Sequence, residues 1–308
     1  MTRWIKWMAA LSAAALMAAC GSDDDPHPGT IATVAQQQGF TALLAAANKA
    51  GLSATLDGTA KLTVFAPTDA AFTALAGRLG FASATALVNA LSADQLSKIL
   101  SYHVLAGEVK KAAVPVGADI TTVEGGLFKV KSVGADLLIT DELLRDSKIT
   151  ATDVAASNGV IHVVDTVLLP EGVLNIVQTA QANPLFSTLV SAVVSANLAG
   201  TLSGAGPLTV FAPTDPAFAA IASVVATLTT EQLTTVLTYH VVAGKVLAAA
   251  IPFGEPITTV AGQTITINAG TPPTISDVTD ATANIVATDI ETSNGVIHVI
   301  DKVLIPAL

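Results

Sequence analysis

Hydrophobic and polar residues follow the same pattern in two places along this chain of 308 residues. Residues 62–72, LTVFAPTDAAF, begin with a short β-prone run and continue with Pro-Thr-Asp and apolar residues at helical spacing. This pattern predicts a strand that leads directly into a helix. Residues 208–218 repeat ten of the eleven letters, with Pro216 in place of Ala70.

The polar residues at this joint predict where the helix begins. Asp and Thr side chains accept hydrogen bonds from the free N–H groups of a first helical turn. Proline is favoured at the first helical position, which Pro216 would then occupy. We therefore expect Asp69 and Asp215 to be the N-caps, with Thr68 and Thr214, one residue earlier, as the alternatives.

A second repeated phrase has the period of an amphipathic helix. Residues 92–103 and 229–240 carry apolar residues at i, i+3 and i+4 and a histidine at i+7, so each histidine lies on the apolar stripe. Each stretch opens with Ser or Thr followed three residues later by Gln, which matches a capping box. The histidines are His103 and His240, and the tyrosines that precede them are Tyr102 and Tyr239.

The third phrase predicts a buried strand. An Asn-Gly turn leads into VIHVVD at residues 160–165 and into VIHVID at residues 296–301. Both faces of the run are apolar except at His162 and His298, as expected of a central strand. The aspartate that ends each run lies on the face opposite the histidine, and we interpret it as a turn or cap carboxylate. Glycine-punctuated residues 121–133 and 258–270 predict further strands.

The three phrases occur in the same order twice, which indicates two copies of one domain. The copies span residues 29–170 and 171–308, and each has an ordinary domain size. The first copy holds about nine extra residues around 77–90, which we interpret as a longer link between helices. Only residues 170–172 separate the copies, so we expect them to be joined closely.

The phrases TVFAPTDAAF, YHV and NGVIHVVDTVLLP, in this order, resemble the fasciclin domain, and the resemblance covers nearly all of the chain after its N-terminal segment, twice. It implies an α+β fold in each copy, a β-sandwich or wedge with helices packed at one side. Family members are mostly secreted, lipid-anchored or matrix proteins associated with adhesion, and the family implies no catalytic residues. In animal relatives the Tyr-His region is linked to integrin-type adhesion. Here we expect a structural pair, because each histidine faces the core.

The N-terminal residues indicate export. Arg3 and Lys6 precede an apolar run at residues 7–17, which is too short to span a bilayer, and Ala-Ala-Cys closes it. This layout resembles the lipobox of bacterial lipoproteins, although Met17 stands where Leu is commonest. We expect residues 1–19 to be a lipoprotein signal, Cys20 to be lipidated, and residues 20–28 to be a polar tether. An ordinary secretory signal with a chance cysteine is the alternative.

Charge and composition restrict the partners. The chain carries 14 basic and 24 acidic residues, and removal of the signal takes away two bases and no acid, which changes the formal charge from −10 to −12. An acidic surface without a basic stripe argues against nucleic acid. Hydrophobic residues make up 51% of the chain, enough for core burial, and no cysteine remains for a disulfide once Cys20 is lipidated.

The residue types present favour packing over chemistry. Zinc normally takes three or four protein ligands, whereas each copy offers two histidines and no cysteine. We therefore expect these histidines to be hydrogen-bonded core residues and expect no catalytic, cofactor or metal site. The glycine-rich run at residues 200–208 lacks the Lys of a phosphate loop, and no GxSxG elbow occurs.

These features favour a non-enzymatic extracytoplasmic lipoprotein that acts as an adhesion or interaction module on the cell envelope, at the outer membrane or the cell surface. The expected partner is a protein or a polysaccharide, and the membrane is reached through the lipid alone. The alternative is a periplasmic ligand-binding or envelope-assembly lipoprotein. A catalytic role has the least support.

Overall fold

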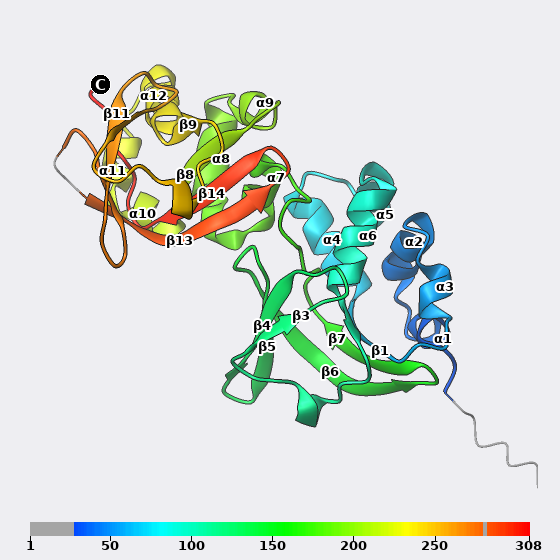
Figure 1. Ribbon diagram of the computed structural model, residues 1–308. Coiled ribbons are helices and arrows are strands. Elements are labelled where there is room, and N and C mark those ends of the chain that lie inside the picture. The colour runs from blue at the N-terminus through cyan, green and yellow to red at the C-terminus, as the bar shows by residue number, and fades with distance from the viewer. Residues whose placement is uncertain (1–27, 280–281) are drawn as a thin grey trace, which may run out of the picture.

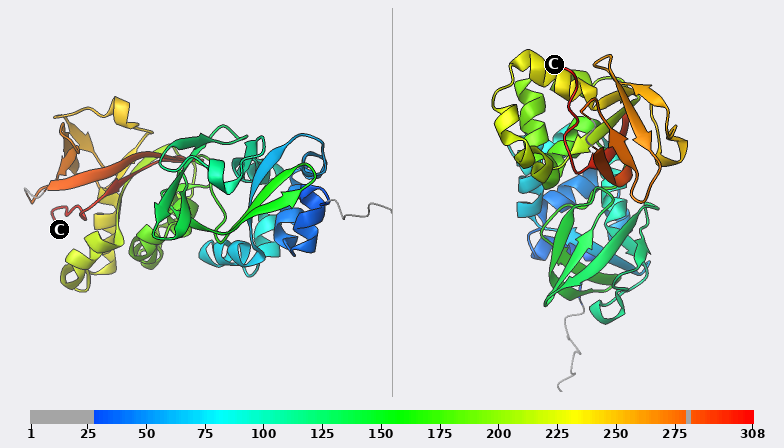
Figure 2. Two further views of the ribbon diagram at one scale, coloured as in Figure 1. Left: turned by 90° about the horizontal axis from the view of Figure 1, so that it is seen from below. Right: turned by 90° about the vertical axis from the view of Figure 1, so that its left-hand side faces the viewer.

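The computed structural model describes residues 28–279 and 282–308 and consists of two similar α+β domains joined end to end (Figures 1 and 2). The predicted signal, its lipidation site Cys20 and nearly all of the tether lie outside the described residues. The first domain is blue to green in Figure 1 and the second is green to red. The predicted α+β architecture is confirmed in both copies.

The first domain begins with helices, continues with one strand and three more helices, and ends mainly in strands. Its elements are α1 (Ile31–Gln37), α2 (Thr41–Lys49), α3 (Ser53–Leu56), β1 (Leu62–Pro67), α4 (Asp69–Arg78), α5 (Ala84–Ala90), α6 (Ala93–Tyr102), β2 (Val104–Ala106), η1 (Lys111–Ala113), β3 (Asp119–Thr121), β4 (Leu127–Val133), β5 (Asp136–Thr140), β6 (Asp146–Ala156) and β7 (Gly159–Val164). The extra residues predicted as a link thus form a helix of their own, α5.

The second domain repeats this order. Its elements are α7 (Ile176–Ala182), η2 (Pro184–Phe186), α8 (Ser187–Ser195), α9 (Ala199–Leu202), β8 (Leu208–Pro213), α10 (Asp215–Ala220), α11 (Ala222–Val225), α12 (Thr230–Tyr239), β9 (Val241–Ala243), η3 (Ala248–Ala250), β10 (Pro256–Thr258), β11 (Thr264–Asn268), β12 (Thr274–Ser276), β13 (Thr282–Thr292) and β14 (Gly295–Ile300). The predicted capping boxes of α6 and α12 are both present.

Each domain contains one seven-stranded sheet with the same strand order. In the first domain the order is β2-β1-β7-β6-β5-β4-β3, and the second domain repeats it with β9-β8-β14-β13-β12-β11-β10. The strand with the histidine, β7 or β14, lies in the interior between a parallel and an antiparallel neighbour. The prediction of a central strand is therefore confirmed, and its two apolar faces match burial on both sides.

The two faces of the first sheet bury different sets of side chains. One face encloses a small core around Phe65, Phe128 and Ile139, with the rings of Phe65 and Phe128 5.2 Å apart and edge to face. The other face packs against the helices. This second core continues from one domain into the next, because Leu143 of the first domain and Phe186 of the second belong to one buried apolar cluster.

Candidate functional site

The repeated aspartates are not the N-caps that the sequence led us to expect. The N-cap of α4 is Thr68, whose Oγ1 accepts a hydrogen bond from the Ala71 N–H at 3.2 Å, and Thr214 holds the same position in α10. Asp69 and Asp215 are the first residues inside their helices, so the preferred assignment was wrong and the alternative one residue earlier was right. Pro216 accordingly stands second in its helix rather than first.

Each aspartate instead binds the start of a neighbouring helix. The Asp69 carboxylate accepts hydrogen bonds from the Ala42 N–H at 2.8 Å and from the Thr41 hydroxyl. Asp215 does the same at the start of α8, and although partial burial opposes it, hydrogen bonds from Ser187 and Thr188 lower the pKa of Asp215. Free N–H groups and the helix dipole make this position favourable for a carboxylate. The repeated phrase therefore fixes two helices to one strand end.

The helical histidines are buried, neutral C-caps. His103 Nε2 accepts a hydrogen bond from the Leu168 N–H at 2.9 Å, so Nδ1 carries the proton and donates it to the Ile99 carbonyl at 2.7 Å. His240 makes the equivalent bonds in the second domain. Burial lowers the pKa of both imidazoles to about 4. Each histidine thus joins its helix to the segment that follows the central strand.

Both ring nitrogens of each strand histidine are also hydrogen-bonded to the backbone. His162 Nδ1 accepts a hydrogen bond from the Asp153 N–H at 3.2 Å, and Nε2 donates to the Val109 carbonyl at 2.9 Å. His298 repeats these bonds, and its burial lowers the pKa of the ring. In the described part of the chain, no group of three His, Cys, Asp or Glu residues is arranged to hold a metal ion.

The tyrosines beside the helical histidines are inaccessible to a partner. Tyr102 and Tyr239 are both 0% exposed. The Tyr102 hydroxyl donates to the Leu127 carbonyl at 2.7 Å and accepts from the Glu142 N–H at 3.1 Å, and burial raises the pKa of the phenol. Tyr239 donates to the Thr264 carbonyl at 2.8 Å. The Tyr-His pairs therefore fasten helices to strands and offer no surface for adhesion.

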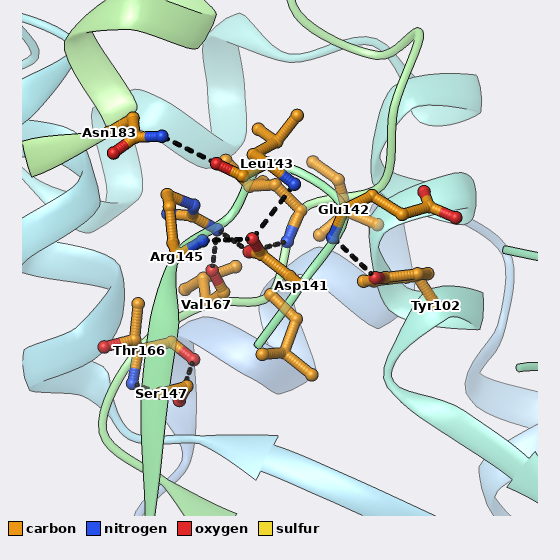
Figure 3. Close-up of polar contacts among 12 residues, drawn as sticks. Tyr102, Asp141, Glu142, Leu143, Arg145, Ser147, Thr166, Val167 and Asn183 are labelled. Atoms are coloured by element: carbon orange, nitrogen blue, oxygen red, sulfur yellow. Dashed lines mark hydrogen bonds and ion pairs between the residues drawn. The ribbon is translucent and has the colours of Figure 1, made fainter. Parts of the chain in front are cut away.

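A buried ion pair at the joint between the domains was missed by the sequence reasoning (Figure 3). Arg145 Nη2 lies 2.6 Å from Asp141 Oδ2, and the two side chains are only 4% and 1% exposed. The same Nη2 donates to the Val167 carbonyl at 2.7 Å, while Asp141 also accepts from the backbone N–H groups of Leu143 and Leu169. The pair therefore shapes the turn between β5 and β6.

The second domain is fastened to this turn. Asn183, which is 1% exposed, donates from Nδ2 to the Leu143 carbonyl at 2.6 Å (Figure 3). The connecting segment is bound from both sides, because the Glu171 N–H donates to Glu142 Oε2 at 3.0 Å and the Gly172 N–H donates to the Glu291 carbonyl at 2.9 Å. These contacts and the shared apolar cluster fix the domains relative to each other.

Acidic side chains surround the connecting segment. Burial, and after it the neighbouring Glu142 carboxylate, raises the pKa of Glu171 to about 8, and Glu291 and Asp289 add to the repulsion. Lys245 pairs with Glu291 at 2.7 Å. The joint therefore holds a carboxyl group that is neutral over much of the acidic and neutral pH range.

At the equivalent turn of the second domain, the described residues form no ion pair. Asp277 corresponds to Asp141 in the repeat and accepts hydrogen bonds from the Thr279 and Ile305 N–H groups at 2.8 and 2.9 Å. The repeat places Ala281, outside the described residues, where the first copy has Arg145. This arginine, which is present in one copy and absent from the other, is the feature of the sequence that could have indicated the joint.

Comparison with known proteins gives one consistent result. The model of the fasciclin domain matches residues 38–170 and again residues 184–306. Protein sll1483 of Synechocystis sp. is 42% identical over 145 residues, which are 45% of this chain and 77% of that protein. The cell surface glycolipoprotein MPB83 of Mycobacterium bovis is 35% identical over 135 residues, 41% of this chain and 58% of that protein.

Among solved structures, a domain pair from the insect cell adhesion molecule fasciclin I matches with a TM-score of 0.43 and 18% identity, over 90% of this chain and 95% of that one. Within the described ranges, no helix combines the length and the apolar run that a membrane span requires.

Proposed function

The chain belongs to the fasciclin family, and from this premise we propose that it is a non-enzymatic interaction module that presents its second domain to a partner at the cell envelope. Fasciclin domains are in general adhesion modules, and the comparisons indicate no catalytic family. The single observation that carries the proposal is the fixed joint between the two copies.

The joint makes the pair one rigid body rather than two independent domains. Domains within a chain move relative to each other by default unless their interface is large and apolar. Here one apolar cluster runs through both domains, and the buried amide of Asn183 is bonded across the joint. A rigid pair holds its distal surface at a constant distance from its attachment point, which suits contact with a partner.

We assign the attachment point to Cys20. The proposal rests on the sequence pattern around this residue, and one relative is itself named a cell surface glycolipoprotein. In the described structure, α1 and the C-terminus lie at opposite ends of the pair (Figure 2). An anchor that precedes α1 would leave the second domain outermost, and a protein or a polysaccharide is the partner class we propose for it.

An exposed aromatic ring on the second domain provides a test position. Phe253 is 44% exposed in the loop before β10, and its equivalent in the first domain, Val116, is 54% exposed before β3. Large exposed aromatic residues are enriched in interfaces, where they fill pockets of the partner. The two positions therefore form a matched pair on the outer and the inner domain.

The test is an attachment assay on cells that display the full chain. Phe253→Asp is expected to reduce attachment while Val116→Asp, the matched control, leaves it unchanged, with surface display of both variants checked by antibody. Cys20→Ser is expected to move the protein from the membrane fraction to the soluble fraction, because stable attachment takes at least two lipid signals, which an acylated lipoprotein cysteine would supply. Attachment that withstands Phe253→Asp would exclude this loop as the contact.

Protease treatment of intact cells distinguishes the proposal from its alternative, a periplasmic ligand-binding or envelope-assembly lipoprotein. A surface module is cleaved by external protease, whereas a periplasmic protein is protected until the outer membrane is opened. Protection in intact cells would overturn the adhesion proposal.

A further inference from the structure

The first domain contains an apolar cavity of ≈190 Å³ between α1–α3 and the sheet, and the cavity is partly open to solvent. Its walls come from helices on one side and from β1 and β7 on the other, and they include Leu43, Ala47, Leu56, Val64 and Ile161. Figure 1 shows α1–α3 as the helices at the end of the domain away from the joint. The cavity therefore lies apart from the contacts between the domains.

The deep part of this cavity offers water no hydrogen-bond partner. His103 is the polar group that lines it there, and both of its ring nitrogens are already bonded to the backbone. A water needs two to four polar partners, and an apolar cavity of about 150 Å³ is known to stay dry and to bind benzene. A cavity of ≈190 Å³ has room for a six-membered ring with a short substituent.

The second domain has almost the same walls and a much smaller cavity. The cavity at the equivalent place measures ≈30 Å³. Of the sixteen residues that line the first cavity, fourteen are identical at the equivalent positions of the second copy. The two that differ are both smaller in the first domain: Ala47 stands where the second has Val193, and Ser101 where it has Thr238. Ala47 and Val193 are 1% and 7% exposed, so the extra methyl groups of the valine lie inside the core.

The rim of the first cavity is amphipathic. Val123 is 52% exposed there, and the hydroxyl groups of Thr55 and Ser101 lie in the exposed and half-buried parts of the lining. A molecule with a hydrocarbon body and one small polar substituent matches this distribution, since its polar end meets hydroxyl groups and water while its body fills the apolar interior.

We propose that the cavity of the first domain is a binding site for a small hydrocarbon group, about the size of an alkylbenzene, and that the second domain has no such site because Val193 fills the equivalent space. An empty apolar cavity forfeits dispersion contacts on every wall, and a hydrocarbon ligand restores them. The site does not depend on the adhesion role proposed above.

The test is a titration of the purified two-domain chain with ethylbenzene, followed in methyl-resolved NMR spectra of labelled Ile, Leu and Val. Saturable shifts are expected for Leu56, Val64 and Ile161 and not for their equivalents Leu202, Val210 and Ile297. The melting temperature is expected to rise with ethylbenzene, because a ligand that binds only the folded state stabilises it.

Two opposite variants make the test specific. Ala47→Leu fills the first cavity and is expected to abolish the saturable shifts. Val193→Ala enlarges the second cavity and is expected to introduce such shifts at Leu202 and Ile297, which keeps the proposal testable if Ala47→Leu does not fold. The absence of saturable shifts up to the solubility limit, equal shifts in both wild-type domains, or shifts that withstand a folded Ala47→Leu variant would each overturn it.

Discussion

The two domains share strand order, capping boxes and histidine contacts, and they differ at one turn, which joins β5 to β6 in the first domain and β12 to β13 in the second. In the first domain this turn, between β5 and β6, holds the buried Arg145–Asp141 pair and is covered by the second domain. In the second domain the equivalent aspartate, Asp277, accepts hydrogen bonds from the N–H groups of Thr279 and Ile305 and from the Thr279 hydroxyl. The residues that form the fold are therefore the same in both copies, whereas the turn differs because, among the described residues, only that of the first domain contacts a neighbouring domain.

The cavities teach the same lesson inside the core. Fourteen of sixteen wall residues are shared, yet the cavity volumes are ≈190 and ≈30 Å³. Protein cores are packed so closely that one or two additional methyl groups change the volume of a cavity. Conservation of the fold therefore leaves room for one copy to hold a ligand and the other to be filled by its own side chains.

The largest effect is expected from removing the aspartate of each turn. Asp141→Ala leaves the buried Arg145 guanidinium without its counter-charge and should cost about 3–5 kcal/mol of the free energy of unfolding. Asp277→Ala, the matched variant, loses hydrogen bonds from the N–H groups of Thr279 and Ile305 and from the Thr279 hydroxyl, and should cost about 1–2 kcal/mol. Urea denaturation of both variants measures the difference. Equal losses would show that the ion pair adds nothing to the joint.

Acid should destabilise both domains through the same group. Burial lowers the pKa of His103 and His240 from 6.5 to about 4, so the unfolded chain binds protons that the folded chain does not. The contribution of each neutral histidine to the free energy of unfolding is fully present above pH 6.5. It decreases as the pH drops towards 4, and the loss reaches about 3 kcal/mol for each histidine below pH 4. Urea midpoints from pH 7 to pH 4 test this, with His103→Gln and His240→Gln expected to flatten the profile equally. A profile that only one variant flattens would contradict the equivalence of the two sites.

Removal of a strand histidine should cost the same in either domain. His162→Ala or His298→Ala leaves one backbone carbonyl and one N–H unpaired beside a void, for a loss of about 1–3 kcal/mol. A chelator should leave the melting temperature of the wild type unchanged. Unequal losses would indicate that one histidine has a further role, and a chelator-dependent drop in melting temperature would indicate a metal.

The smallest effect is expected at the connecting segment. The pKa of Glu171 is raised from 4.5 to about 8, so the folded state holds a proton that the unfolded state releases. This contribution is complete below pH 4.5 and is lost as the pH rises to 8, where an ionised Glu171 faces Glu142 and Glu291. Glu171 is only partly buried, so solvent screens this repulsion and the effect on stability is smaller than for the fully buried histidines. Glu171→Gln should match the wild type at pH 5 and be slightly more stable at pH 9, as measured by urea denaturation. The same pH dependence in both proteins would contradict the assignment.

The capping positions show where local sequence is ambiguous. Thr and Asp stand side by side at the start of α4 and α10, and both residue types cap helices well. The threonine became the cap because the aspartate binds the N-terminus of a second helix, α2 or α8. The local sequence does not show that a second helix begins next to this aspartate. Capping propensity alone therefore could not decide whether Thr or Asp is the N-cap.

Local pattern determined most of the fold. The alternation of apolar residues, the capping boxes and the Asn-Gly turns depend on neighbours within a few positions, and they located the helices, the central strands and the repeat itself. The burial of the histidines also followed from periodicity, since a residue on an apolar stripe must face the core.

Tertiary structure alone decided the joint and the cavity. Asn183 meets Leu143 across the domain boundary, and Arg145 meets Val167 from 22 residues away. Whether Ala47 opens a cavity depends on the distance between α2 and the sheet, which no local pattern encodes. Contacts of this kind arise when whole helices and strands pack against one another. The residue types are present in the sequence, but which of them meet is decided by the tertiary structure.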